Sequence, residues 1–188
     1  MRRWRGRLSP ALRRLDRRVS AHFAKAVHRS PFLRHVAVLL AHSGDGVIWS
    51  AAAVGAFLGL SQERQPILYA AIAMLLAALL VWGCKMIFRR QRPSPISPNM
   101  VYMVPRHDPF SFPSGHAARV ASIAASAHLF PDLPGLGALR WPLVAWAAGV
   151  CWARVSLSVH YVLDVVVGVG VGLLAVALSS ILRSVVSC

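Results

Sequence analysis

Residues 66–84 form a run of nineteen residues without one charged side chain. A helix of that length is about as long as the hydrocarbon core of a bilayer is thick, roughly 30 Å. The composition of the chain agrees, because 56% of its 188 residues are hydrophobic and only 14% are charged. An ordinary soluble domain has about 25% charged residues. The sequence therefore predicts a small integral membrane protein.

Four further apolar segments occur at residues 46–60, 114–130, 141–153 and 157–182. The region before residue 62 allows two interpretations, namely one long helix, or an interfacial turn followed by a span over residues 46–60. We favour the second, because Gly44 and Gly46 flank Asp45 and such a cluster favours a break. We therefore predict an all-α integral membrane bundle with about five transmembrane helices, preceded by a basic amphipathic helix.

The basic N-terminal segment carries eleven of the 21 Lys and Arg residues within residues 1–35, with Asp16 as its single acid. Apolar side chains recur there every three or four positions over residues 8–29, which predicts an amphipathic helix in the lipid headgroup region. We assign residues 1–35 to this segment and residues 36–188 to a membrane-embedded domain. Basic residues confined to one flank favour anionic lipid headgroups over nucleic acid as partners. They also predict that the N-terminus and the functional site lie on the cytoplasmic face of a bacterial cytoplasmic membrane.

Polar residues cluster at the predicted helix ends, around a loop over residues 91–113 whose six prolines exclude a helix. Because successive spans alternate in direction, the end of the second span, the start of the third, the end of the fourth and the start of the fifth lie on one membrane face. Ionisable residues beside membrane spans are functional candidates. The side chains that can converge on this face are Lys85, Arg92, Ser114, His116, Arg154, His160 and Asp164.

The cations among these residues point to an anionic ligand. Three permanent positive charges, on Lys85, Arg92 and Arg154, favour an anion with several oxygens, which means phosphate or, less often, sulfate or vanadate. Ser114 and Gly115 begin a predicted helix, whose backbone N–H groups and positive dipole end also bind phosphate oxygens. The sequence therefore predicts a phosphate-binding site.

Two histidines can supply the chemistry at that site. His160 and Asp164 are four residues apart, so they share one helix face and the carboxylate can accept a hydrogen bond from one imidazole nitrogen. The other imidazole nitrogen is then free to attack. His116 comes from a different helix and can protonate the leaving oxygen as a general acid.

Taken together, these residues resemble the three-part signature of the type 2 phosphatidic acid phosphatase (PAP2) superfamily. The three parts are Lys85 with Arg92-Pro93, Pro113-Ser114-Gly115-His116, and Arg154 with His160 and Asp164. The resemblance implies hydrolysis without a metal or other cofactor, through a phosphohistidine on His160, with Asp164 orienting it and His116 as the acid. The phosphate would be bound by Lys85, Arg92, Ser114, Gly115 and Arg154. The chain departs from the pattern at Ala153, where the family usually has Ser, and this change is expected to remove one phosphate hydrogen bond.

Within the superfamily the chain is most similar to the small polyisoprenoid and presqualene diphosphate phosphatases, because of its basic leading helix, its paired arginines before Gln91 and the Ser111-Phe112 pair before the second motif. We therefore expect a phosphatase acting on the phosphate or diphosphate of an isoprenoid-type phospholipid. Alternatives are a glycerolipid phosphatase, acting on phosphatidic acid or phosphatidylglycerophosphate, and a prenyl-phosphoryl sugar phosphate phosphatase. A vanadate-dependent haloperoxidase has a similar signature, but those enzymes are soluble, so the apolar spans argue against one. The presence of His116, His160 and Asp164 argues against a non-catalytic pseudophosphatase.

Four further polar residues lie near the predicted site or in the loops beside it. Arg119 lies one turn after His116 and is a further candidate for contact with the substrate, or else with lipid phosphates. Asp45 is expected to have a structural role. His107 and Asp108 are expected to be ordinary loop residues rather than parts of a mouth or lid.

Overall fold

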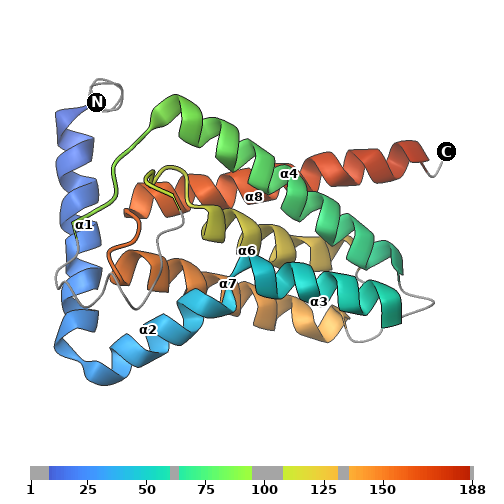
Figure 1. The fold of residues 1–188 in the computed structure, drawn as a ribbon, viewed down its shortest axis with the longest axis horizontal. Coiled ribbons are helices and arrows are strands. Elements are labelled where there is room, and N and C mark those ends of the chain that lie inside the picture. The colour runs from blue at the N-terminus through green and yellow to red at the C-terminus, as the bar shows by residue number, and fades with distance from the viewer. Residues whose placement is uncertain (1–8, 60–63, 95–107, 131–135, 187–188) are drawn as a thin grey trace.

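The computed structural model describes residues 9–59, 64–94, 108–130 and 136–186 (Figure 1). Within these ranges the chain is helical, apart from loops and an isolated bridge between Gln91 and Phe110. The helices are α1 (Pro10–Arg29), α2 (Pro31–Ser43), α3 (Gly46–Gly59), α4 (Arg64–Phe88), α6 (Gly115–Ser126), the short 3₁₀ helix η1 (Ala127–Leu129), α7 (Leu136–Ser156) and α8 (Val162–Val186). The predicted all-α fold is confirmed.

Helix α6 packs against α4, α7 and α8, and most of its residues are buried. Its small side chains let neighbouring backbones come close. A Cβ atom at Gly168 or Gly172 of α8 would collide with the carbonyl oxygen of Ser114 or Ala118, respectively. Glycine at these two positions therefore holds the start of α6 against the start of α8.

Two helices, α4 and α8, are each long and apolar enough to cross a membrane. Helix α4 exposes large apolar side chains such as Leu75, Leu79 and Trp82, as expected for a surface that faces lipid. Helices α2 and α3 qualify only as a pair, bent by 49°. Among the described residues, length and composition thus support two to three spans, where the sequence predicts about five.

The break between α2 and α3 lies where the sequence predicts it, because α2 ends at Ser43 and α3 begins at Gly46. Helix α3 has 14 residues, so at 1.5 Å per residue it is about 21 Å long, less than the roughly 30 Å of a bilayer's hydrocarbon core. The turn packs directly on α7, since a Cβ atom at Gly44 would come within 2.8 Å of Val150. This contact brings the turn to the edge of the site described below.

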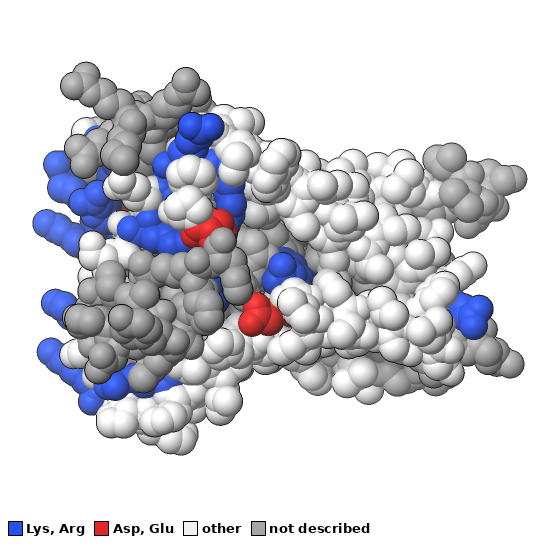
Figure 2. Space-filling model, in the orientation of Figure 1, with Lys and Arg blue, Asp and Glu red and all other residues white. Residues whose placement is uncertain are grey.

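Helix α1 lies across one end of the bundle and contacts α2, α7 and α8 (Figure 1). The predicted helix is confirmed, and the face that it buries consists of Asp16, Ser20, Ala24 and Val27. The apolar stripe stays exposed, and Leu15, for example, has 58% of its surface accessible. Lys and Arg side chains gather at the same end of the molecule (Figure 2). Helix α1 therefore presents apolar and basic side chains outward and a small, partly polar face to the protein.

Candidate active site

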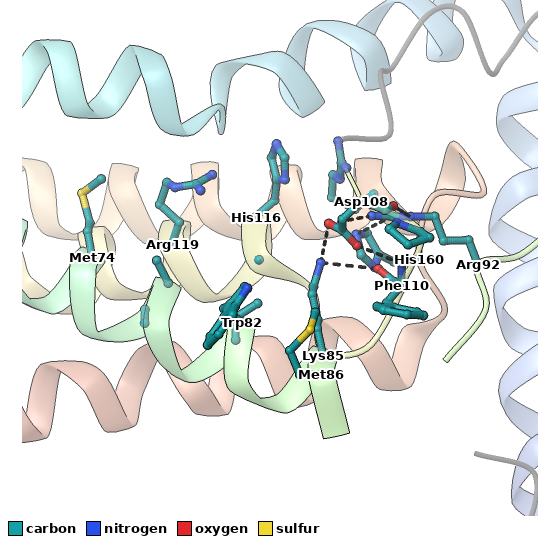
Figure 3. Close-up of a pocket in the computed structure, with 16 residues that line it drawn as sticks. Met74, Trp82, Lys85, Met86, Arg92, Asp108, Phe110, His116, Arg119 and His160 are labelled. Carbon is teal, nitrogen blue, oxygen red and sulfur yellow. Dashed lines mark hydrogen bonds and ion pairs between the residues drawn. The ribbon is translucent and has the colours of Figure 1, made fainter. Parts of the chain in front are cut away.

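The C-terminal ends of α4 and α7 and the N-terminal ends of α6 and α8 meet at the end of the bundle covered by α1. A cavity of about 500 Å³ lies there, with an apolar wall from α4 that includes Met74, Ala77, Ala78, Val81 and Trp82 (Figure 3). Of the nine residues singled out from the sequence, the cavity is lined by Lys85, Arg92, Gly115, His116, Arg119, Arg154 and His160. The other two, Ser114 and Asp164, are fully buried behind it.

His160 lies in the turn between α7 and α8. Its Nδ1 lies 2.8 Å from the carbonyl oxygen of Ser111, and because a carbonyl only accepts, the proton belongs on Nδ1 and the lone pair on Nε2. Nε2 lies 3.2 Å from a guanidinium nitrogen, Nη1, of Arg92. Burial lowers the pKa of His160 well below its ordinary value, and the nearby cations lower it further. His160 is therefore neutral at pH 7, with Nε2 as the nitrogen that can attack.

Asp164 is fully buried in the first turn of α8. Its Oδ2 accepts a hydrogen bond from the backbone N–H of Tyr161 at 2.9 Å and lies 3.7 Å from Nδ1 of His160. Its Oδ1 pairs with Arg90 at 2.6 Å. The hydrogen bond that the sequence predicts between Asp164 and His160 is replaced by the one to the Ser111 carbonyl, so Asp164 lies beside the imidazole without a hydrogen bond to it.

Lys85 and Arg92 are held by a carboxylate that sequence reasoning left outside the site. Asp108 Oδ2 lies 2.7 Å from the Lys85 ammonium and 3.2 Å from Arg92 Nη2. Arg92 also donates to the backbone carbonyls of Asp108 and Val159, at 3.0 Å each. Burial opposes ionisation of Asp108, but the hydrogen bond and charge of Lys85, together with Arg92, outweigh it and hold the pKa of Asp108 below its ordinary value. Asp108 is therefore an anion that forms ion pairs with two of the three cations predicted to bind phosphate.

Arg154 is the third of these cations, and it differs from the other two. Only 3% of its surface is exposed. Within the part of the chain that the structure describes, its buried Nε has no hydrogen-bond partner. A buried N–H group without a hydrogen-bond partner is costly, since it has lost the hydration that it would have in water. Arg154 therefore lines the cavity as a cation suited to an anionic ligand.

His116 faces the α2–α3 turn, where its Nε2 lies 3.3 Å from Asp45 Oδ1. The other carboxylate oxygen of Asp45 lies 3.6 Å from Nδ1 of His42. The Asp45 carboxylate can therefore accept a hydrogen bond from Nε2 of His116 when that nitrogen carries the proton. Arg119 binds the same turn, donating to the Gly44 carbonyl at 3.1 Å. Asp45 thus contacts the predicted general acid, a pairing that its position in the sequence does not reveal.

Ser114, predicted to bind phosphate, has both its hydroxyl and its backbone N–H engaged within the protein. The Ser114 hydroxyl caps α6 by accepting a hydrogen bond from the backbone N–H of Ala117 at 3.4 Å, and its own N–H donates to the Asp164 carbonyl at 2.9 Å. Ser114 therefore fixes the helix start rather than lining the cavity.

Ala153 is fully buried in an apolar cluster with residues such as Val27 and Leu157. Its side chain belongs to the packing beneath α1 and α2 and is not part of the cavity wall.

No group of three or more His, Cys, Asp or Glu side chains suited to a metal ion occurs in the described ranges. The polar side chains of the site are instead arranged as cations, two imidazoles and the carboxylates that pair with them. Such an arrangement can bind a phosphoryl group, attack it with a neutral imidazole nitrogen and protonate a leaving oxygen.

A family model described as the PAP2 superfamily matches residues 66–186. The chain belongs to this superfamily. The PAP2 chain is 31% identical over 181 residues to a probable lipid phosphate phosphatase beta of Arabidopsis thaliana, covering 82% of this chain and 84% of the relative. It is 33% identical over 135 residues to the decaprenylphosphoryl-5-phosphoribose phosphatase of Mycobacterium tuberculosis, covering 71% of each chain.

Solved structures with the same fold include a transmembrane PAP2 type phosphatidylglycerolphosphate phosphatase from Bacillus subtilis, with a TM-score of 0.76 over 94% of this chain and 88% of that one. Another is LpxE of Aquifex aeolicus, with a TM-score of 0.71 over 88% and 94%. Both are 24% identical to this chain. The PAP2 protein is therefore a membrane-embedded lipid phosphate phosphatase, a hydrolase, as the family resemblance of its motifs predicts.

Proposed function

We propose that this PAP2 protein removes the phosphate, or one phosphate of a diphosphate, from an isoprenoid-type lipid, through a phosphohistidine on His160 and without a metal ion. The observation that carries the chemistry is a neutral imidazole nitrogen, Nε2 of His160, at the wall of a cavity that also holds Arg154, a buried cation whose Nε has no hydrogen-bond partner among the described residues. Two further features support the lipid class. The wall from α4 is apolar, and the Mycobacterium tuberculosis relative is named for a decaprenyl-linked substrate.

The phosphate is bound by Lys85, Arg92, Arg154 and the backbone at Gly115, where α6 begins. The positive end of the α6 dipole and the three cations surround the phosphoryl oxygens. The lipid tail lies along the apolar wall of α4. Binding displaces the Asp108 carboxylate from Lys85 and Arg92, because the two anions need the same cations.

In the first step Nε2 of His160 attacks phosphorus, forming an N–P bond while the bond from phosphorus to the lipid oxygen breaks. The electron pair of the broken bond stays on that oxygen, which takes a proton from His116. The imidazole becomes positively charged, and the Ser111 carbonyl and the Asp164 carboxylate stabilise it through Nδ1. The Asp45 carboxylate orients the imidazole of His116 as the proton donor.

In the second step water attacks the phosphohistidine and the N–P electron pair returns to Nε2 of His160. His116, now neutral, accepts a proton from the attacking water and is ready for the next cycle. Inorganic phosphate leaves as the product.

We also propose the topology and division of the chain that the sequence predicts. Helix α3, which follows the interfacial turn, together with α4, α6 with η1, α7 and α8, makes five crossings, and residues 36–188 form the phosphatase domain. Residues 1–35 form the basic interfacial segment, whose exposed side chains contact anionic lipid headgroups. Helix α1 lies at the end of the bundle where the helix ends that line the cavity meet (Figure 1). Its positive charge (Figure 2) therefore favours the cytoplasmic face of a bacterial membrane for both.

Phosphate release by the purified protein in detergent, with EDTA present, tests the proposal. The panel contains farnesyl and polyprenyl mono- and diphosphates, a prenyl-phosphoryl sugar phosphate, phosphatidic acid and phosphatidylglycerophosphate. We expect release from the isoprenoid substrates, none from the His160→Ala variant, and acid-labile, base-stable phosphate on the protein after rapid quenching. Release from glycerolipids alone would overturn the substrate class, and turnover that survives in His160→Ala would overturn the mechanism.

A further inference from the structure

Helix α1 buries an acidic side chain on the same side as the active site. Asp16 is the only acid in the basic segment, yet only 6% of its surface is exposed. Its Oδ1 accepts a hydrogen bond from the backbone N–H of Leu163 at 3.0 Å, in the first turn of α8. Its Oδ2 forms an ion pair with Arg90. A carboxylate that served only to make α1 soluble would point outward, like the basic residues beside it.

Arg90 connects Asp16 to Asp164. The Arg90 guanidinium is buried, with one nitrogen on Asp16 and another on Asp164 Oδ1 at 2.6 Å. It also stacks over the ring of Tyr161, with 4.0 Å between the guanidinium carbon and the ring centre. One cation is thus shared by two carboxylates from helices at opposite ends of the chain.

Arg90 reaches His160 by two routes. Through its side chain it holds Asp164, whose other oxygen lies 3.7 Å from Nδ1 of His160. Through its backbone it accepts a hydrogen bond from the Ser111 N–H at 2.8 Å, and the Ser111 carbonyl accepts from Nδ1 of His160 at 2.8 Å. Both routes end on the imidazole nitrogen that fixes the tautomer of the nucleophile.

We propose that Asp16 is a positioning residue for this nucleophile, so that α1 is part of the active site as well as a membrane-surface helix. The proposal rests on the proposed role of His160. Two carboxylates around one guanidinium leave one net negative charge beside the imidazole. When Asp16 is neutral, Arg90 compensates Asp164 fully, and the positive charge that develops on His160 loses its counter-charge.

Asp16→Asn tests the proposal, with Ser20→Ala as the matched control. Ser20 lies one turn further along α1, is equally buried, and accepts a hydrogen bond from the N–H of Val162, next to Leu163. Both variants weaken the contact between α1 and α8, but only Asp16→Asn removes the negative charge that Arg90 neutralises together with that of Asp164. The measurements are kcat, KM and the acid limb of the pH profile of kcat/KM on a short-chain substrate, with melting temperatures in detergent.

We expect Asp16→Asn to lower kcat about tenfold to a hundredfold, the range for losing a hydrogen bond to a buried charged group, with KM within about twofold of the wild type. The acid limb should move to lower pH, because removing a negative charge lowers the pKa of the imidazole. Ser20→Ala should keep the wild-type limb even where its melting temperature falls as far. Equal kinetics in the two variants would show that Asp16 is only a structural contact. An acid limb of kcat/KM that stays at the wild-type pH in Asp16→Asn would show the same.

Asp16→Glu keeps the test decisive if the amide variant folds poorly, since it preserves the charge and moves it by one methylene. Its acid limb should stay at the wild-type pH, and a limb displaced to lower pH would overturn the proposal. Failure of the proposed function has a separate signature, namely turnover that survives His160→Ala in the same series, and that result would remove the basis of this proposal too.

Discussion

Replacing Arg154 with Met should lower the activity of the protein and raise its stability. Arg154 is as buried as Arg90, with 3% and 4% of their surfaces exposed, but their surroundings differ. Arg90 is paired with two carboxylates, whereas the Nε of Arg154 has no partner in the described parts of the chain. Methionine fills a similar volume without a charge, so the Arg154→Met variant leaves no large cavity.

The activity loss follows from the proposed contact of Arg154 with the phosphoryl group. Removing one donor to the charge that develops in a transition state lowers kcat by about 10²–10³. The stability gain follows from the cost of an unpartnered buried group, about 1–3 kcal/mol. For a chain of this size, about 2–4 °C of melting temperature corresponds to 1 kcal/mol, so the apparent melting temperature in detergent should rise by roughly 2–12 °C.

Arg90→Met is the matched control, because it removes a buried cation that does have partners. Breaking a buried ion pair from one side costs about 3–5 kcal/mol, so this variant should melt well below the wild type. Thermal unfolding of the three proteins, with and without vanadate, makes the comparison, and vanadate should stabilise the wild type more than Arg154→Met. A melting temperature of Arg154→Met as low as that of Arg90→Met would refute the reasoning, since it would mean that Arg154 is already paired in the resting protein.

The other charged pairs of the site give further tests. Asp45→Asn should lower kcat on the order of a hundredfold with little change in KM, because an amide does not stabilise protonated His116; steady-state kinetics showing a wild-type kcat would make Asp45 purely structural. Asp108→Asn should lower KM, since phosphate no longer displaces a carboxylate, and a higher KM would contradict that competition. Because the pKa of Asp108 is lowered in the folded protein, its ion pairs stabilise the wild type above about pH 4 and this advantage should vanish in melts at lower pH. The acid limb of kcat/KM in the wild type should lie below pH 6.5, because burial lowers the pKa of His160; a limb above that value would place the nucleophile elsewhere.

The sequence predicts those parts of the fold that local chemistry determines. The start of α6 follows from Ser114, a strong helix cap, after a proline-rich loop. The break after Ser43 follows from two glycines around an aspartate. The meeting of the helix ends follows from alternation alone, because side chains at successive ends of antiparallel helices share one face of the membrane.

The contacts around the nucleophile lie beyond such reasoning. The Ser111 carbonyl is a backbone group, and a backbone acceptor leaves no mark in the residue types. Asp16 and Arg90 are 74 residues apart, and in a segment rich in arginine a single aspartate suggests a local surface pair. The periodicity of α1 predicts that its apolar stripe faces a membrane, but it does not reveal that the opposite face packs on the protein through Asp16.

The resting arrangement of charge also explains how the site can bind a phosphate and then release it. A phosphate monoester carries nearly two negative charges at pH 7, and three bare buried cations would hold it, and the inorganic product, tightly. Asp108 compensates Lys85 and Arg92 in the resting protein, so an anion binds only by displacing a carboxylate that remains tethered nearby. The competition weakens the ground-state affinity for substrate and product alike, and tight ground-state binding does not raise kcat. Arg154 has no such competitor in the described ranges, so it remains the cation that an incoming phosphate meets without displacing anything.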